Sequence, residues 1–365
     1  MVGVSEVKAT ADGGILPSAE FCMLGRMATI KEISRKAGVS PTTVANVLYG
    51  RTAKVSAETR EKVQAIIDAD NYAPNMGAMM LLKNNSRIIG VIMFTEPRKN
   101  ETVLEDPFSS AILGAMEREI RESGYYMMLY TTSDEAEVVR LSKAWKMDGL
   151  ILVWVPGNIC RIINSSIDVP CVYIDCFFED TIHTYHNIGL EDRKGGYEVT
   201  KYLLSMGHRD ILFLPCNPIF PGGDSQRFAG CQDAFAEQGL VLDDDASRPL
   251  PYDRAKRLKI YLEIARKKTH TALVFSSDFY ASEALTYLQE HGVRIPEDLS
   301  ITGFDDNIFS RLVQPRLTTV HQDSSKKGTL AIQMLLKLIH DQPVEQVRIN
   351  LPIRLEVRDS VHKLS

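Results

Sequence analysis

The spacing of hydrophobic residues near the amino terminus predicts a short helix that ends in a sharp turn. Ile30, Ile33 and Ala37 recur at intervals of three and four positions, which places them on one face of a helix. Gly38 follows directly, and glycine is the residue that most readily adopts the left-handed backbone with which helices often end. The chain is therefore expected to turn sharply after residue 37.

A second helix is predicted immediately after this turn. Ser40 is suited to cap it, and Pro41 fits its first position because the missing N–H is not needed there. Val44, Val47 and Leu48 form an inward stripe, which leaves the opposite face polar. A helix that is apolar behind and rich in threonine and asparagine in front suits contact with DNA bases and phosphates. The alternative is a small structural helical hairpin. The outward residues are Thr42, Thr43 and Asn46.

A third helix is predicted at about residues 56–70, where Val63, Ile66 and Ile67 form another inward stripe. We expect it to brace the first two helices. A break then precedes a short apolar segment at 76–83, which is also expected to be helical. Three helices followed by a short fourth predict a small helical head joined to the rest of the chain by a linker.

From residue 88 the pattern changes to short apolar strands that alternate with amphipathic helices. This alternation predicts α/β architecture, with parallel sheets covered by helices on both faces. The number of units favours two lobes, with a ligand held in the cleft between them at the carboxyl ends of the strands. The predicted strands are 88–93, 126–130, 149–155, 171–174, 210–214, 271–275 and 300–304. The predicted helices are 110–123, 135–146, 195–206, 227–238, 281–291 and 324–340.

The composition is typical of a globular protein, since 44% of the 365 residues are hydrophobic and 24% are charged. No apolar run approaches the length of a membrane span, and residues 1–26 lack the apolar core of a secretory signal. We expect 1–26 to be a disordered extension, with Met27 or Met23 as an alternative start.

The six cysteines form no C-x-x-C pair, which predicts free thiols in a reducing cytoplasm and no metal site or cofactor.

The charge is distributed unevenly along the chain. The net charge is −5, but residues 27–87 contain nine Lys or Arg against five Asp or Glu. A basic head on an acidic body fits a phosphate-binding module attached to a domain that does not touch DNA. Ordinary charge scatter is the alternative, because the surplus is modest.

Six segments in the same order make the chain resemble the lactose-repressor/galactose-repressor family of bacterial transcription regulators. They are MATIKEISRKAGVSPTTVANVL with KVSAETREKVQAIIDADNYAPN in the head, then DGLIL, GGYEVTKYLLSMGHRDILFL, RIPEDLSITGFDD and PRLTTVHQD. The resemblance covers about residues 27–360. It implies a helix-turn-helix head, a hinge helix and an effector domain shaped like periplasmic sugar-binding proteins.

The resemblance also implies domain boundaries. The DNA-binding domain is expected at 27–74, the hinge helix and linker at 75–87, and the effector-binding and dimerisation domain at 88–365. The first lobe is expected at about 88–186 and 323–351, and the second at about 187–322 and 352–365.

Matching positions in the family imply the DNA contacts. Pro41, Thr42 and Asn46 match base-reading positions, and Leu81 matches a hinge leucine that wedges into the minor groove and kinks the duplex. Helix capping is the alternative role for Thr29 and Ser40, and a plain tether is the alternative for the hinge. The hinge departs from the family at Gly77 and Met79, so it is expected to fold only on DNA or with effector. The residues that match phosphate-contacting positions of the family are Thr29, Ser40, Thr43 and Tyr72.

The same comparison implies an effector site. Arg227 matches a ligand-gripping arginine and Asp305 an acceptor across the cleft, a pair that suits a sugar or a heterocycle. A structural salt bridge is the alternative for Arg227, and core packing for the aromatic residues. The loop 94–108 is longer than the family norm, and Glu191-Asp192 replaces the more usual Asp-Asn. Further candidate ligand contacts are Ser277, Asp278, Phe108, Trp154, Phe220 and Phe279.

The predicted function is that of a sequence-specific DNA-binding regulator in the bacterial cytoplasm. The resemblance implies a repressor whose operator affinity is controlled by a small molecule, with a carbohydrate as the first expectation. It acts on double-stranded DNA with a pseudo-palindromic operator, as a homodimer and without a membrane partner. A corepressor-dependent or activating regulator is the alternative, and a protein corepressor is a further possible partner. An enzyme and a solute-binding protein are remote alternatives, since no catalytic motif and no signal peptide are found.

Overall fold

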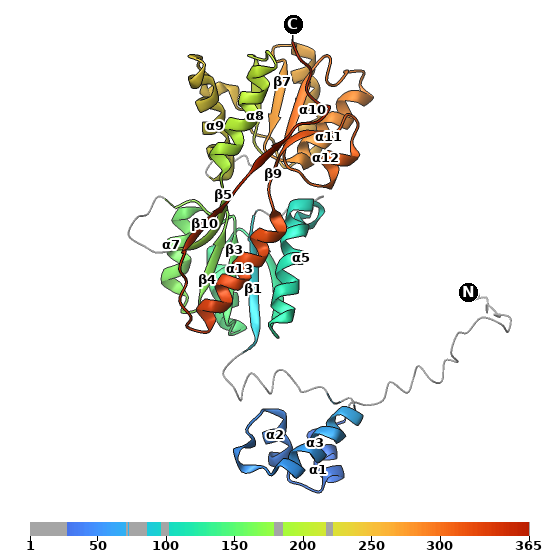
Figure 1. The fold of residues 1–365 in the computed structure, drawn as a ribbon, viewed down its shortest axis with the longest axis vertical. Coiled ribbons are helices and arrows are strands. Elements are labelled where there is room, and N and C mark those ends of the chain that lie inside the picture. The colour runs from blue at the N-terminus through green and yellow to red at the C-terminus, as the bar shows by residue number, and fades with distance from the viewer. Residues whose placement is uncertain are drawn as a thin grey trace, which may run out of the picture. The chain divides into compact units, whose positions relative to one another are not determined.

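The computed structural model describes residues 28–70, 72, 86–95, 102–178, 185–216 and 222–364. The chain divides into two compact units, Met1–Asn84 and Asn85–Ser365 (Figure 1). The expectations for residues 1–26, for the hinge helix with Leu81, and for Phe220 lie outside the described residues.

The first unit contains the three predicted helices and a short 3-10 turn, η2 (Thr52–Lys54). The helices are α1 (Ile30–Ala37), α2 (Pro41–Leu48) and α3 (Ala57–Ala69). Their inward stripes meet in a small core in which Ile33, Val44 and Val63 are fully buried. The predicted helix pair and its bracing third helix are therefore confirmed.

Local chemistry fixes the ends of α1. Thr29 and Glu32 form a capping box, in which each side chain accepts a hydrogen bond from the backbone N–H of the other residue. Gly38 ends the helix with a φ of 68°, as expected of a left-handed cap. Lys36 then donates to Asp70 at 2.6 Å, which ties the end of α1 to the end of α3.

The second unit contains two sheets. The first sheet has the strand order β10-β5-β4-β3-β1-β2, and all its pairs are parallel. Every residue of β1 is buried, as its continuous apolar sequence predicts for a strand that is covered on both faces. Its strands are β1 (Ile88–Phe94), β2 (Tyr126–Thr132), β3 (Gly149–Val153), β4 (Cys171–Ile174), β5 (His186–Leu190) and β10 (Arg348–Leu351).

The second sheet has the order β11-β9-β8-β7-β6, in which β11 is antiparallel to β9 and the other pairs are parallel. We call the part built on the first sheet lobe 1 and the part built on the second sheet lobe 2. The strands of lobe 2 are β6 (Ile211–Leu214), β7 (Ala272–Phe275), β8 (Ser300–Asp305), β9 (Thr318–His321) and β11 (Arg354–Glu356).

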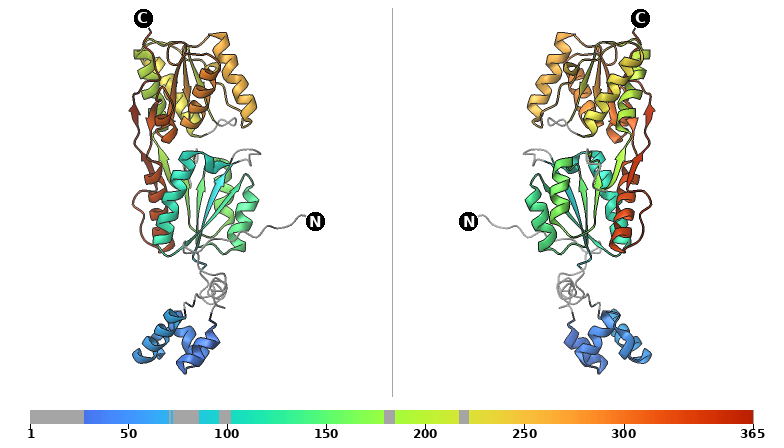
Figure 2. Two further views of the ribbon diagram at one scale, coloured as in Figure 1. Left: turned by 90° about the vertical axis from the view of Figure 1, so that its right-hand side faces the viewer. Right: turned by 90° about the vertical axis from the view of Figure 1, so that its left-hand side faces the viewer.

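Helices cover both faces of each sheet (Figure 2). In lobe 1, α5 packs against α13 and α6 against α7; in lobe 2, α8 packs against α9 and α10 against α11. The helices are α5 (Pro107–Glu122), α6 (Glu135–Ala144), α7 (Gly157–Ser166), α8 (Asp192–Ser205), α9 (Gly223–Glu237), α10 (Arg254–Lys267), α11 (Asp278–Glu290), α12 (Ile308–Leu312) and α13 (Ser324–Ile339). The 3-10 turns η3 (Val103–Glu105) and η4 (Asp244–Ala246) lie between them.

The chain passes between the lobes three times, after β5, after β9 and after β10. Because β5 belongs to the first sheet, lobe 1 extends to Leu190, a few residues beyond the expected boundary near 186. Several elements were not predicted from the sequence, and most of them are short. They are α7, α10, α12, β5, β9, β10 and β11.

The two helices of lobe 2 that follow the first crossing pack with almost no space between their backbones. A Cβ at Gly196 of α8 would lie 1.8 Å from the carbonyl oxygen of Arg227 in α9. A Cβ at Gly230 of α9 would lie 1.8 Å from the carbonyl oxygen of Arg193 in α8. The two glycines therefore set the distance between α8 and α9, and with it the position of Arg227.

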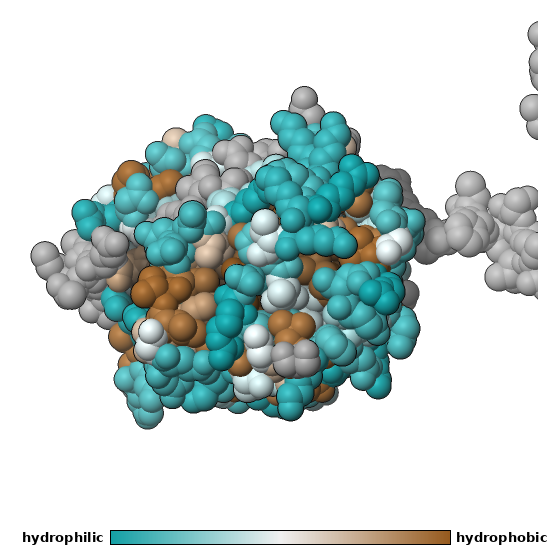
Figure 3. All heavy atoms as spheres, turned by 90° about the horizontal axis from the view of Figure 1, so that it is seen from above, coloured by the Kyte–Doolittle hydropathy of each residue, from teal (hydrophilic) through white to brown (hydrophobic). Residues whose placement is uncertain are grey.

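Most of the surface seen from the end that carries the carboxyl terminus is hydrophilic, with hydrophobic residues in small groups (Figure 3). Among the described residues, the exposed large apolar side chains include Ile308 and Leu312 of α12 and Val241 after α9. No helix in the described part of the chain is long and apolar enough to cross a membrane.

Candidate DNA-binding and effector sites

The outward face of α2 is polar, as the sequence predicts. Pro41 and Thr42 are exposed, and Thr43 and Asn46 are partly exposed. Val44 and Val47 hold the opposite face against the core, so the polar face points away from α1 and α3. This is the arrangement of a helix that can enter a DNA groove and present side chains to base edges.

Two of the predicted phosphate contacts also cap helices. The Ser40 hydroxyl accepts a hydrogen bond from the backbone N–H of Thr43 at 3.1 Å and lies 2.9 Å from the Thr43 hydroxyl. The Thr29 hydroxyl accepts from the backbone N–H of Glu32 at 3.3 Å. Both caps leave the residues exposed at the amino ends of α1 and α2, where backbone N–H groups and the helix dipole favour phosphate.

Tyr72 is partly buried against the core of the head, and burial raises the pKa of its phenol. Its backbone N–H donates to Ile67 at the end of α3. The ring is therefore held by the head itself. Its predicted role in phosphate contact remains a prediction, as do the DNA contacts of Pro41, Thr42 and Asn46.

Arg227 is the centre of a buried polar group in lobe 2. Its Nε donates to Asp192 at 2.8 Å, its Nη1 donates to the Ser276 carbonyl at 2.6 Å, and Asp224 lies 3.7 Å from Nη1. The guanidinium also stacks 3.6 Å from the Phe304 ring centre. Burial alone would lower the pKa of Arg227, but Asp192 and Asp224 raise it, so the guanidinium stays charged. The structural salt bridge and a role in ligand binding are thus compatible, since its Nη2 makes no hydrogen bond to any described residue.

Asp305 ends β8 and accepts two hydrogen bonds. The Ser277 hydroxyl donates to one oxygen at 3.2 Å, and the Gln322 amide donates to the other at 2.6 Å. Burial and the neighbouring Asp278 raise the pKa of Asp305 well above its usual range. A carboxyl in this buried place can exchange hydrogen bonds with hydroxyl groups, as an acceptor when ionised and as a donor when protonated.

A link between the lobes, which the sequence did not predict, continues from Asp305. Gln322 accepts from the Lys327 ammonium at 2.9 Å through the oxygen of the same amide that donates to Asp305. Lys327, in α13 of lobe 1, donates to both oxygens of Asp175 at 2.7 and 2.9 Å and is fully buried. We call Asp175–Lys327–Gln322–Asp305 the interlobe relay. The sequence signal for it is a lysine on the inward stripe of an apolar helix, four and eight positions before Ala331 and Leu335.

Asp278, another predicted ligand contact, has partners within lobe 2. Asp278 is fully buried, and its two oxygens accept from the Thr319 hydroxyl at 2.6 Å and from the Asn307 backbone N–H at 2.9 Å. Burial raises its pKa to about 7. Both partners belong to lobe 2, so Asp278 holds β9 and the start of α12 to α11, and its effector contact remains a prediction.

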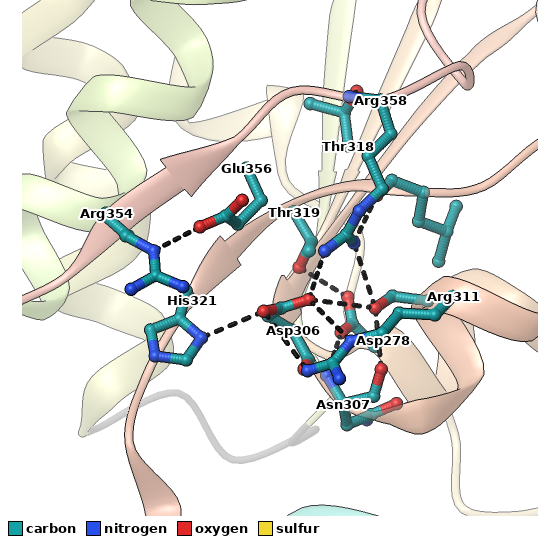
Figure 4. A network of polar contacts seen from close by, with 12 residues as sticks. Asp278, Asp306, Asn307, Arg311, Thr318, Thr319, His321, Arg354, Glu356 and Arg358 are labelled. Carbon is teal, nitrogen blue, oxygen red and sulfur yellow. Dashed lines mark hydrogen bonds and ion pairs between the residues drawn. The ribbon is translucent and has the colours of Figure 1, made fainter.

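Next to it, Asp306 anchors the end of β8 (Figure 4). Arg358 and Arg311 surround its carboxylate, and His321 lies 3.0 Å away. Burial alone would raise the pKa of Asp306, but the hydrogen bonds from Arg358 and His321 lower it. Asp305 and Asp306 have φ angles of 120° and 55°, each of which costs about 1–3 kcal/mol. The ion pairs of Asp306 hold this backbone, and so position Asp305.

The predicted aromatic residues divide between two places. Phe108 and Trp154 stack with ring centres 6.1 Å apart, and the Lys327 ammonium lies 5.2 Å from the Phe108 ring centre. Both rings also pack against the core of lobe 1, so the core-packing alternative holds for them as well. Phe279 packs against Tyr280 and Phe309 in lobe 2. Phe108 and Trp154 are thus the aromatic candidates next to the interlobe relay.

Among the described residues, no group of histidine, cysteine and carboxylate side chains has the arrangement of a metal site. The described cysteines are all free, and Cys160, Cys176 and Cys231 are buried. The polar side chains near the segments that connect the two lobes are hydrogen-bond donors and acceptors.

A helix-turn-helix head and a two-lobed α/β domain with polar residues where the lobes meet define a class of DNA-binding regulators controlled by small molecules. Residues 29–75 match the family model for bacterial regulatory proteins of the lacI family, and residues 200–361 match the periplasmic binding protein-like domain. The chain is 31% identical over 344 residues to the HTH-type transcriptional repressor PurR of Pasteurella multocida, which covers 92% of this chain and 99% of that protein. It is 30% identical to PurR of Histophilus somni, over 93% of this chain and 100% of the relative.

Solved structures show the same fold. The Lac repressor dimer bound to operator and the anti-inducer ONPF has a TM-score of 0.78 at 24% identity, covering 92% of this chain and 100% of that one. The transcriptional regulator CelR in complex with cellobiose has a TM-score of 0.67 at 23% identity, covering 91% and 99%.

The chain belongs to the lacI family of bacterial regulatory proteins. It is a DNA-binding transcriptional repressor regulated by a small-molecule effector, as the sequence analysis predicted.

Proposed function

We propose that two copies of this protein bind a pseudo-palindromic operator in the bacterial cytoplasm, and that a carbohydrate effector changes their affinity for it. The observation that supports DNA binding is the polar outward face of α2. Its exposed Thr42 and partly exposed Asn46 follow the Ser40 cap, and the opposite face of the helix packs on the core of the head. Asparagine can bond adenine with two hydrogen bonds, and the caps offer N–H groups to phosphate.

The proposed effector site consists of Arg227, Asp305, Ser277, Phe108 and Trp154. A guanidinium donor and a buried carboxyl group suit hydroxyl groups, which both donate and accept hydrogen bonds, and aromatic faces suit the apolar side of a sugar ring. Solved relatives support this class, since one holds cellobiose and another D-xylulofuranose. We assign no catalytic role to these residues.

Two observations support the proposed homodimer. They are two exposed apolar side chains on α12 and the dimeric state of a solved structure with the same fold. Ile308 and Leu312 of α12 are 57% and 71% exposed, although both are large and apolar. Exposed apolar side chains that lie together favour a protein interface. The Lac repressor structure with the same fold is a dimer on its operator.

Selection of bound duplexes from a random DNA pool, at near-physiological salt, tests the proposal. An enriched palindrome with two half-sites would support a dimeric, sequence-specific regulator. Salt-sensitive binding to every sequence without enrichment would contradict it, because that is the behaviour of phosphate contacts alone. The enriched palindrome then serves as the operator in the following measurement.

Replacing Asn46 with alanine is expected to weaken operator binding about 10- to 100-fold, because a bidentate contact with a base contributes about 1–3 kcal/mol. Fluorescence anisotropy with the selected operator measures the loss. Binding to a scrambled duplex should change little, since Asn46 is uncharged.

Gln64→Ala is the matched control, since Gln64 also carries an amide but lies exposed on α3. It should bind the operator like the unmodified protein. An equal loss in both variants, or an equal loss on the scrambled duplex, would argue against base reading by Asn46.

A further inference from the structure

We propose that Asp148 is a positioning residue for operator binding, because it fixes the backbone at the point where the chain enters lobe 1 from the head. The inference rests on the proposed binding of two copies to one operator. Asp148 is the first residue of the DGLIL segment and directly precedes β3. We call Ser86 and Arg87, which directly precede β1, the entry turn.

The Asp148 carboxylate accepts hydrogen bonds from two consecutive backbone N–H groups. Ser86 donates to one oxygen at 3.1 Å, and Arg87 donates to the other at 3.0 Å. The Ser86 hydroxyl also donates to the carboxylate, at 3.4 Å, and accepts from the backbone N–H of Ile88 at 3.1 Å. Hydrogen bonds to a charged acceptor are stronger than those between neutral groups. One side chain thus holds the whole entry turn.

The conformation of the entry turn indicates a fixed geometry. Arg87 has a φ of 53°, in the left-handed region where a residue with a side chain is strained, and such strain persists only where the surrounding structure holds it. The Arg87 carbonyl accepts from the backbone N–H of Tyr126 at 2.7 Å, and the backbone N–H of Asp148 donates to the Ile88 carbonyl at 2.9 Å. Ser86 is only 1% exposed, although it is polar. The turn is therefore held from both of the strands that flank β1.

Strand β3 connects the entry turn to an effector candidate of lobe 1. Asp148 precedes this strand and Trp154 follows it, so about 20 Å of extended chain separate the two residues. β3 pairs with β1 (Figure 1), and every residue of both strands is buried. Two paired and buried strands move as one rigid piece. A displacement of lobe 1 at the effector site therefore also displaces the entry turn.

Operator binding requires this fixed geometry more than non-specific binding does. Two heads on one operator must reach half-sites at a fixed spacing. If Asp148 did not hold the entry turn, each copy would have to order these residues on binding, which costs conformational entropy. Binding to a random sequence needs phosphate contacts but no particular spacing. The hydrogen bonds of Asp148 should therefore raise the affinity for the operator alone.

The experiment compares full-length Asp148→Ala and Asp134→Ala by fluorescence anisotropy, on the selected operator and on a scrambled duplex. Asp134 is the matched control, since it also lies in lobe 1 and its carboxylate accepts from the backbone N–H of Ala136 at 2.9 Å. Both variants lose one negative charge. We expect Asp148→Ala to weaken operator binding about 5- to 50-fold, because two residues in each copy must then be ordered. Its binding to the scrambled duplex should change about twofold at most.

A second substitution keeps the test decisive where alanine unfolds lobe 1. Asp148→Asn keeps the size of the side chain and one acceptor oxygen, but its NH2 group cannot accept the second N–H. It should fold and show a smaller loss of operator affinity in the same direction. Asp134→Ala should bind both duplexes like the unmodified protein. Unchanged operator binding by a folded Asp148 variant, or an equal loss on the scrambled duplex or in Asp134→Ala, would overturn the inference.

Brief digestion with trypsin tests the entry turn without DNA. Trypsin cuts after arginine, and the bond from Arg87 to Ile88 joins the entry turn to a buried residue. The fragment that begins at Ile88, measured by mass spectrometry, should form about tenfold faster from Asp148→Ala than from Asp134→Ala, because cleavage requires local opening. Equal rates would also overturn the inference. Failure of the duplex selection would instead refute the proposed operator binding, and the trypsin result would not depend on it.

Discussion

Replacing Gly196 with alanine is expected to lower the free energy of unfolding by about 3 kcal/mol or more, or to prevent folding of lobe 2. The new Cβ would lie 1.8 Å from the carbonyl oxygen of Arg227 and 2.6 Å from its carbonyl carbon. Both atoms are backbone, so α8 and α9 must move apart instead of a side chain turning aside. Urea unfolding followed by circular dichroism measures the loss.

Gly114→Ala is the control for this substitution. Gly114 also lies within a helix, α5, but nothing lies within 4 Å of the position its Cβ would take. Alanine there should stabilise the protein by about 0.5–1 kcal/mol, because glycine loses more backbone freedom on folding. If both variants had the same stability, close backbone packing would not be the reason for Gly196. Since Arg227 supplies the carbonyl, a folded Gly196 variant should also respond less to effector.

The second large effect is expected on replacing Lys327 with methionine, which keeps the length of the side chain and removes its charge. The ammonium is fully buried and makes two bonds to Asp175 and one to Gln322. Removing one partner of a buried ion pair costs about 3–5 kcal/mol, and we expect the lower end because the Asp175 side chain is 14% exposed. Thermal and urea unfolding measure this loss.

Two further variants separate the ion pair from general effects of losing a lysine. Lys326→Met changes the neighbouring residue, which is exposed, and should leave the stability within about 0.5 kcal/mol. Lys327→Met combined with Asp175→Leu should recover most of the loss, because no buried charge is then left without a partner. Equal stability of the two single methionine variants would contradict the interlobe relay as an energetic link.

The sequence predicted the elements whose hydrophobic residues follow a helical or a continuous apolar period. The three helices of the head and the long α13 were found in this way, and so were β1 and β8, which are buried along their whole length. The strands at the crossings were not found. β5, β10 and β11 have three to five residues, and two of the four residues in β10 are exposed, so they show no apolar run.

Prediction of the effector site from the sequence was limited in a similar way. Arg227 and Asp305 stood out because they match a motif, and the structure surrounds both with polar partners. Asp278 comes three positions after the end of β7, and its side chain turns inward to Thr319, a direction that a sequence does not show. Lys327 was missed for the opposite reason. Lysine is rarely buried, and only the partners 152 and five positions away in the chain make its burial possible.

The three passages of the chain between the lobes have a consequence for how the protein is made. Lobe 1 needs α13 and β10, and lobe 2 needs β11, which is formed by Arg354–Glu356. When residues 1–340 have been translated, β10 and β11 are still missing, so neither lobe has its complete sheet. We expect both lobes to mature together after nearly all of the chain has emerged, whereas the head, which is continuous in sequence, can fold while translation proceeds.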